Sequence, residues 1–297
     1  MLALLGRSPK KAASGPRPRA QLGVEQLETR YCPSGLQILS FAATPENNGK
    51  WVDLHGTVSD SNLASVSITF SGVASGVTTT DANGAFDCQV VASGLGVVSA
   101  SALDLDGVTA SANSSVTDTA PTLTMNLAYG ANKTVILSGK VTDAQAGGMV
   151  VTFSGVVNGT ATTDANGNYS VTLTPTALGQ ITATTTDIWG LTSASATATV
   201  ANSAPTITLA ATQRGNMWTF SGRVTDEYAP GLVVTFSGPG AINGRTTTVA
   251  SDGTFTLSVM LTSNDAGWVT ATVTDWWGLA ADAQYFLPKH GNGGGGG

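Results

Sequence analysis

Short runs in which apolar and polar residues alternate make up most of the chain. The segments 134–141, 149–153 and 169–174 place an apolar residue or a glycine at nearly every second position. A period of two buries one face of a strand and leaves the other in water, as in antiparallel sheets. No segment between residues 35 and 288 keeps a convincing helical period over ten residues. The pattern therefore predicts an all-β protein.

The strand pattern recurs at a fixed interval. Segment 54–60 returns as 137–143 and 220–226, each with a glycine at its third position and an aspartate at its end. The Phe-Ser-Gly triplet at Phe70 returns at Phe153 and Phe236, and every step is 83 residues. A period this regular indicates tandem copies of one small module.

One copy holds seven short alternating segments in fewer than 90 residues, separated by turns such as the Asn-Gly turn at 164–167. This spacing predicts a seven-stranded immunoglobulin-like β-sandwich, since a propeller blade needs four strands and about half the length. We predict a basic, disordered segment at 1–34, immunoglobulin-like repeats at 35–120, 121–204 and 205–288, and a disordered glycine-rich tail at 289–297. Short junctions with a proline should restrict bending and give an elongated rod.

The turns of the repeats resemble a known module type. The turn at 80–84, the strand after it and the turn at 186–190 are similar to bacterial immunoglobulin-like repeats of adhesins and surface proteins. The resemblance covers residues 35–288. It implies a non-catalytic structural or adhesive protein whose partners are cell-envelope or extracellular proteins or polysaccharides.

Charge is sparse and unevenly distributed. Charged residues make up 11% of the chain, against about 25% in typical soluble proteins. Residues 1–34 hold six basic and two acidic residues, whereas the remainder holds seven basic and seventeen acidic ones. The acidic repeats offer no basic face to nucleic acid. No apolar run approaches the ~18 residues that suggest a membrane span.

The basic segment ends in a recognisable motif. Residues 24–34 resemble the VEQLE-x-R-x-x-PS sorting segment (the LEPR-XLL-like group) that opens many planctomycete-type surface and exported proteins. The residues that carry the match are Leu27, Glu28, Arg30, Pro33 and Ser34. The resemblance implies export to the cell surface or the extracellular space. A disordered basic tail with one short helical turn is a compatible interpretation.

Aspartates recur at equivalent turns of the copies. The two sets present in all three are Asp60, Asp143 and Asp226, and Asp104, Asp187 and Asp275. Oxygens that converge at sandwich ends or module junctions could bind calcium. The simpler interpretation is that each aspartate caps its own turn through a hydrogen bond to the backbone. We predict no cofactor and no firm metal site, and keep these six residues as candidates for calcium.

Tryptophans are the second set of candidates. Trp189 and Trp277 occupy equivalent turns, and Trp276 precedes the latter. If they are exposed, they could stack on sugar rings, which makes carbohydrate binding by the third repeat the alternative function. If they are not, they pack against strand ends or a neighbouring module. The remaining tryptophans in or beside strands are predicted to be core or core-edge residues: Trp51, Trp218 and Trp268.

Catalytic motifs do not occur in the sequence. His55 lies on the polar face of its strand, where the other copies have serine, and His290 is in the tail. There is no nucleophile motif, and no glycine-rich phosphate loop follows a strand and opens a helix. Cys88 alternates with apolar neighbours and is predicted to be a small core residue. We therefore predict that the protein is not an enzyme.

Overall fold

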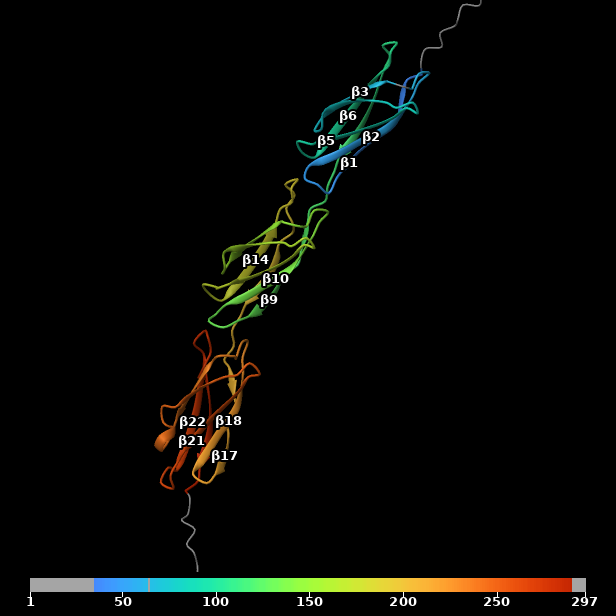
Figure 1. Ribbon diagram of the computed structural model, residues 1–297. Helices are drawn as coiled ribbons and strands as arrows, with labels where there is room; N and C mark the ends of the chain where they lie inside the picture. Colours follow the sequence, from blue (N-terminus) through green and yellow to red (C-terminus); the bar gives the residue numbers. More distant parts are fainter. Residues whose placement is uncertain (1–34, 64, 290–297) are drawn as a thin grey trace, which may run out of the picture.

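The chain folds into three β-sandwiches that follow one another end to end. The computed structural model describes residues 35–63 and 65–289. Six antiparallel sheets in this part of the chain pair into three modules, and the modules form an elongated rod (Figure 1). The protein is thus all-β, with tandem immunoglobulin-like sandwiches, as the alternation and the 83-residue step predict.

The first module contains seven strands. Their bounds are β1 (Gln37–Pro45), β2 (Trp51–Ser59), β3 (Ser67–Gly72), β4 (Gly76–Thr79), β5 (Ala85–Val91), β6 (Gly96–Leu103) and β7 (Thr109–Val116). One sheet has the order β1-β2-β5 and the other β4-β3-β6-β7.

The second module repeats this plan with its first strand in two pieces. Its strands are β8 (Thr122–Leu123), β9 (Asn126–Tyr129), β10 (Val135–Thr142), β11 (Val150–Gly155), β12 (Gly159–Thr162), β13 (Asn168–Leu173), β14 (Gly179–Thr185) and β15 (Ala196–Val200). Strand β10 pairs with β8, β9 and β13, and the other sheet has the order β12-β11-β14-β15.

The third module keeps the same order and adds one turn of 3-10 helix. Its elements are β16 (Thr206–Ile207), β17 (Ala210–Arg214), β18 (Met217–Thr225), β19 (Val233–Ser237), η1 (Gly240–Ile242), β20 (Thr246–Thr248), β21 (Thr254–Met260), β22 (Gly267–Thr274) and β23 (Ala280–Leu287). Helix η1 fills a loop that is longer here than in the other copies.

The glycine of the repeated motif lies closely against the first strand of each module. A Cβ atom on Gly139 would lie only 2.0 Å from the Thr124 carbonyl oxygen, and the equivalent glycines are equally crowded. That carbonyl accepts a hydrogen bond from the Tyr169 hydroxyl at 2.6 Å, while the Lys140 amide donates to the Thr124 hydroxyl at 3.0 Å. Regular pairing of the second module's first strand stops at Thr124, although the alternation over 122–127 predicts one strand.

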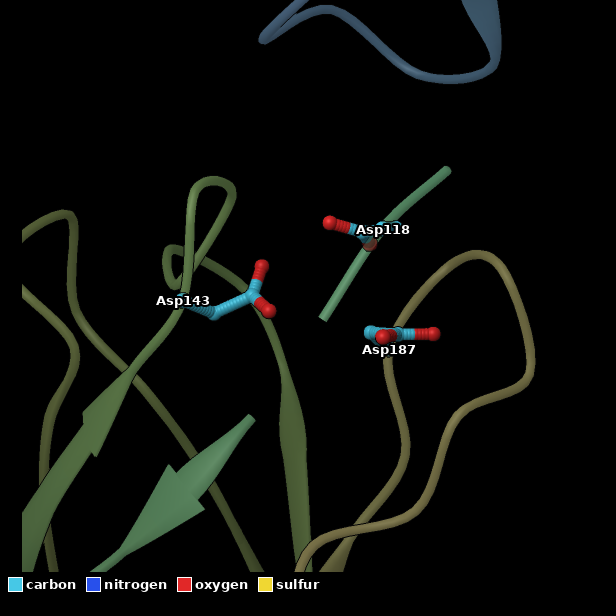
Figure 2. Close-up of side chains that lie close together, drawn as sticks. All are labelled: Asp118, Asp143 and Asp187. Atoms are coloured by element: carbon cyan, nitrogen blue, oxygen red, sulfur yellow. The ribbon is translucent and has the colours of Figure 1, made fainter. Parts of the chain in front are cut away.

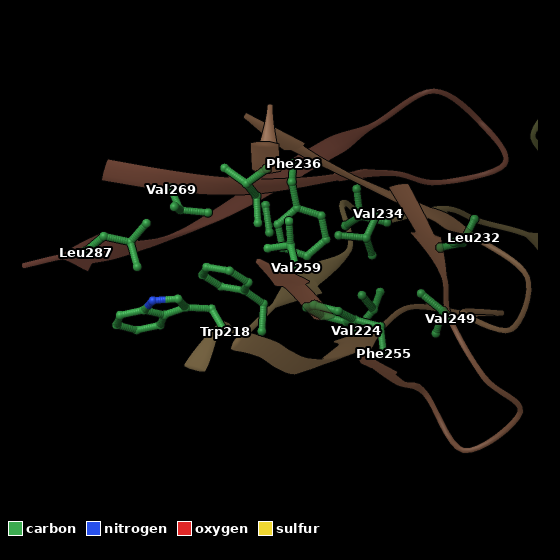
Figure 3. Packing of buried hydrophobic residues seen from close by; sticks show 14 of the residues in the cluster. Trp218, Val224, Leu232, Val234, Phe236, Val249, Phe255, Val259, Val269 and Leu287 are labelled. Carbon is green, nitrogen blue, oxygen red and sulfur yellow. The ribbon is translucent and has the colours of Figure 1, made fainter. Parts of the chain in front are cut away.

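Each module has its own apolar core between its two sheets. The recurring phenylalanines Phe70, Phe153 and Phe236 lie at the centres of the three cores. The third core is the most aromatic, since Trp218 stacks on Phe220 with ring centroids 6.3 Å apart. Figure 3 shows Trp218, Phe236 and Phe255 enclosed by valines and Leu287. Separate cores make the modules distinct packing units along one chain.

Two of the tryptophans that were predicted to lie in or near cores are exposed. Trp218 is buried as expected, whereas Trp268 is 60% exposed and Trp51 is 40% exposed. Both follow the alternation, but they fall on the outer face of their sheets, so their size misled the prediction. Cys88 is half-buried and packs against the first core, and burial raises the pKa of its thiol.

Candidate functional site at the module junctions

The two junctions between modules are built from equivalent parts. Each contains a linker that ends in a proline, Pro121 at the first junction and Pro205 at the second. The hairpin that joins the first two strands of the earlier module faces two loops of the later one, at the end of the sandwich (Figure 1). At the first junction these loops are the β10–β11 loop and the β14–β15 loop.

A tryptophan from the later module packs against the core of the earlier one at both junctions. Trp189 of the second module contacts the first core, and Trp277 of the third module contacts the second core. Lysines at equivalent positions of the earlier hairpins cover these rings. The Nζ atoms of Lys50 and Lys133 lie 5.8 and 4.9 Å from the ring centroids of Trp189 and Trp277. The same apolar and cation–π contact therefore occurs twice.

Trp276 has a different place from its neighbour. Its ring packs against the third core, and its Nε1 atom donates a hydrogen bond to the Tyr228 carbonyl oxygen at 3.1 Å. All three candidate tryptophans of the turns, Trp189, Trp276 and Trp277, are half-buried. The structure thus gives each of them protein contacts and leaves only part of each ring in solvent.

Gln145 adds polar contacts that are specific to the first junction. Its side-chain amide accepts a hydrogen bond from the Gly49 amide at 2.9 Å and donates to the Gly49 carbonyl at 3.0 Å and the Glu46 carbonyl at 3.3 Å. These contacts tie the β10–β11 loop to the β1–β2 hairpin. The equivalent position of the third module is Tyr228.

Each candidate aspartate accepts backbone hydrogen bonds within its own turn. Asp104, Asp187 and Asp275 each accept the amide four residues later at 2.8 Å. Asp60, Asp143 and Asp226 each accept the amide two residues later, at 2.8 to 3.3 Å. Each of these backbone hydrogen bonds thus uses a single carboxylate oxygen of its aspartate.

Two of the six candidates come together at the first junction with a third aspartate. Asp143 begins the β10–β11 loop, Asp187 begins the β14–β15 loop, and Asp118 lies in the linker (Figure 2). One carboxylate oxygen from each lies within 4.8 Å of the others. Asp118 was not among the candidates, because nothing in its own turn marks it. Its position three residues before the junction proline is the signal that could have found it.

Asp187 is the most buried member of this group, which we call the junction triad (Asp118, Asp143 and Asp187). Its side chain is 8% exposed. The Oδ1 atom accepts the Leu191 amide, whereas the Oδ2 atom is buried without a hydrogen-bond partner. A buried carboxylate oxygen without a donor is costly in free energy.

The second junction carries an amide in place of the linker carboxylate. Asn202 stands three residues before Pro205, as Asp118 stands before Pro121. Its Nδ2 atom donates a hydrogen bond to Asp275 Oδ2 at 2.8 Å. Asp275 Oδ1 accepts the Leu279 amide, as Asp187 Oδ1 accepts the Leu191 amide. The two Oδ2 atoms are therefore equivalent, and only the one at the second junction has a donor.

Two further acidic residues lie at the second junction, and one oxygen of each, Asp226 Oδ1 and Glu227 Oε2, is buried without a hydrogen-bond partner. The Glu227 carboxylate accepts hydrogen bonds from the amide and the hydroxyl of Ser203. Burial, together with the charges of Glu227 and Asp275, raises the pKa of Asp226 to about 6. Asp226 and Asp275 thus face one another at this junction, whereas Asp60 and Asp104 of the first module join no group of three acids among the described residues.

His55 lies on an outer sheet face rather than at a junction. Its Nδ1 atom is 3.1 Å from Asp53 Oδ2, and the imidazole is 46% exposed. Burial and the charge of Asp53 raise the pKa of the neighbouring Asp87 carboxyl. Within residues 35–63 and 65–289, no serine or threonine hydroxyl is hydrogen-bonded to His55, so the arrangement lacks the nucleophile–base contact of a hydrolytic triad.

The sorting motif lies outside the described residues. Leu27, Glu28, Arg30, Pro33 and Ser34 all fall within 1–34, so export through this segment stays a prediction. Among the residues that the structure does describe, no helix has the length and hydropathy that a membrane crossing requires.

Comparisons with known proteins give only distant structural likenesses. No protein-family model matches the chain, and no curated protein matches it. A tetra-tandem repeat from the extending region of a large adhesion protein is 25% identical over 86% of this chain and 74% of that one, with a TM-score of 0.33. Invasin, described as a bacterial integrin-binding protein, is 20% identical over 84% of this chain and 60% of its own, with a TM-score of 0.32. These TM-scores are low, so the class rests on the strand pairing and the repeat of this chain.

The chain is a tandem array of immunoglobulin-like β-sandwich modules. Its sheets, its three cores and the recurring contact at its junctions define that class.

Proposed function

We propose that the protein is an exported, non-catalytic component of the cell surface or extracellular space, in which three modules form a structural or adhesive rod. The observation that supports this most is the repeated junction contact. A rod that only tethered its modules would need no Trp189 or Trp277 seated on the preceding core. Apolar burial at both junctions favours one fixed relative orientation over free bending.

The composition supports the same function. The modules are acidic and sparsely charged, which disfavours nucleic acid as a partner. Their partners are therefore proposed to be cell-envelope or extracellular proteins or polysaccharides. The head segment at 1–34 supplies the route of export in this proposal, through its resemblance to a sorting segment.

Fractionation of the source cells tests the location directly. We expect the protein in the envelope or culture-supernatant fraction, accessible to protease added to intact cells, with its mature N-terminus determined by mass spectrometry. Full-length protein with an uncut head, protected from protease inside the cytoplasm, would contradict the proposal.

X-ray scattering of the purified chain tests the rod. The maximum dimension of the wild type should match three sandwiches in line. In the double variant Trp189→Ala, Trp277→Ala the maximum dimension should decrease and the distribution of interatomic distances should broaden. Trp268→Ala is the matched control, because that ring lies on the outer face of β22 and is 60% exposed. An unchanged distance distribution in the double variant would contradict a rod fixed by these contacts.

Carbohydrate binding by the third module is a second candidate function, on a different tryptophan from those expected. Trp268 and Phe286 are 60% and 53% exposed on neighbouring strands β22 and β23, with ring centroids 5.2 Å apart. Thr270 and Gln284 continue the same face as polar neighbours. Aromatic rings flanked by hydroxyl and amide groups suit a polysaccharide. The first two modules have Val97 and Gln180 in place of Trp268.

Affinity electrophoresis against cell-wall and plant polysaccharides tests this second function. We expect retardation of the full chain that is lost in Trp268→Ala and kept in the control Trp51→Ala. Equal retardation of the wild type and Trp268→Ala would contradict it.

A further inference from the structure

We propose that the junction triad binds one divalent cation, with Ca²⁺ as the ion that fits best, and that this ion locks the first module to the second. The second junction does without it. This goes beyond the proposed surface function, because binding of the ion can be measured wherever the protein resides.

The chemistry of the triad points to a cation. One carboxylate oxygen from each of the three aspartates lies within 4.8 Å of the other two (Figure 2). Two oxygens on opposite sides of a Ca²⁺ ion are about 5 Å apart, since each Ca–O distance is about 2.4 Å. The three groups are therefore close enough to share one ion. Backbone oxygens and water would complete its coordination.

Within residues 35–63 and 65–289, no basic side chain forms an ion pair with these three carboxylates. Among the described residues the ion pair formed is that of His55 with Asp53, on the outer sheet face of the first module. Lys50, the lysine of the first junction, instead lies over the Trp189 ring. Three like charges at this separation repel one another. A divalent ion would remove that repulsion.

A buried, unpartnered oxygen gives an independent indication. Asp187 is more than nine-tenths buried, and its Oδ2 atom has no hydrogen-bond donor. The capping bond from the Leu191 amide involves only Oδ1, so turn capping does not account for the second oxygen. A metal ion is the ligand that would satisfy a desolvated anionic oxygen in this position.

The second junction shows what replaces the ion. The oxygen equivalent to Asp187 Oδ2 is Asp275 Oδ2, and it accepts the Asn202 amide at 2.8 Å. Where the linker offers a carboxylate, the loop oxygen lacks a donor; where the linker offers an amide, the loop oxygen has one. The exchange of Asp118 for Asn202 therefore gives Asp275 Oδ2 the donor that Asp187 Oδ2 lacks.

Calorimetric titration of calcium chloride into the chelator-treated full chain tests the site. We expect one binding event, at a dissociation constant in the range of about 10⁻⁴–10⁻³ M typical of extracellular modules. Asp118→Asn should weaken it at least tenfold, and Asp60→Asn, the matched control in the first module, should leave it unchanged. Asn202→Asp should add a second event. Magnesium chloride in the same titration should bind more weakly.

Three results would overturn the proposal. They are no heat of binding up to about 10 mM calcium, full affinity in Asp118→Asn, or no added site in Asn202→Asp. Hydrogen exchange in all three modules checks that Asp118→Asn folds. We expect it to fold, because the second junction already has an asparagine, Asn202, at the equivalent position. In the wild type, exchange in the loops at 143–147 and 187–191 should slow about tenfold at a calcium concentration ten times the dissociation constant. Unaltered exchange on saturation would show that the ion does not hold the junction.

Discussion

At both junctions a tryptophan of the later module is seated on the core of the earlier one, beneath a lysine. Around this shared contact the polar residues differ. The first junction has three convergent aspartates and a glutamine bridge, whereas the second has an asparagine–aspartate hydrogen bond and a serine–glutamate contact. The apolar contact is therefore the same at both junctions, while the polar contacts around it differ from one junction to the other.

The largest expected effect comes from the shared contact. Trp277→Ala should destabilise the second module by about 2 kcal/mol, since a half-buried indole is lost from its core edge. Trp189→Ala should do the same to the first module. Hydrogen exchange followed by mass spectrometry reads each module separately. If the substitution instead lowers protection from hydrogen exchange in the module that carries the tryptophan, the ring does not belong to the core of the preceding module.

A smaller effect is expected from the polar contact of the second junction. Asn202→Ala removes the donor to Asp275 Oδ2 and should cost about 1–3 kcal/mol, the usual cost of a buried group left unsatisfied. The second junction would then resemble the first without its ion. Hydrogen exchange at the amides of residues 275–279 measures this loss of stability. The control is Asn47→Ala, at an exposed position of the first module. Equal protection in the two variants would contradict the prediction.

The second junction should also depend on pH. Asp226 has its pKa raised to about 6, first by burial and then by Glu227 and Asp275, against about 3.9 in an unfolded chain. The native state therefore binds more protons between these values, so stability falls as the pH rises from about 4 to about 6. Urea unfolding monitored by exchange in the third module should show this trend. Asp226→Asn should flatten it, and a trend that is the same in the variant would exclude Asp226 as its source.

The smallest effect should separate the two lysines. A cation over an exposed aromatic ring contributes about 0.5–1 kcal/mol. Lys133 lies closer to its ring than Lys50 does, at 4.9 against 5.8 Å. Lys133→Met should therefore loosen its junction more than Lys50→Met does, as measured by exchange at the tryptophan turns. The reverse order would show that the distance to the ring does not set the difference.

The fold could be predicted from the sequence because its information is local and repeated. Alternation places Phe153, Tyr169 and Ile181 inside, and all three are buried. Alternation alone does not tell which face of the sheet a large aromatic residue takes when apolar residues occur on both faces of the strand. Trp268 lies on the outer face of β22 because its neighbours Val269 and Ala271 occupy the inner one.

The candidate site could be predicted only in part. The recurrence of Asp143 and Asp187 marked them as turn residues, and their turns are formed as expected. Asp118 was missed because its place in the triad depends on two loops that begin 25 and 69 residues later in the chain. Pairing across a junction is a tertiary property, and no local pattern encodes it.

The seating of Trp189 and Trp277 has a consequence for cooperativity. The first and second modules each borrow one side chain from the module that follows, so either of them lacks part of its core when separated from that module. Stability in such an array is a sum of intrinsic module terms and nearest-neighbour coupling terms. The coupling here is directional: unfolding of the third module uncovers the second, and unfolding of the second uncovers the first, whereas the opposite order removes no borrowed ring.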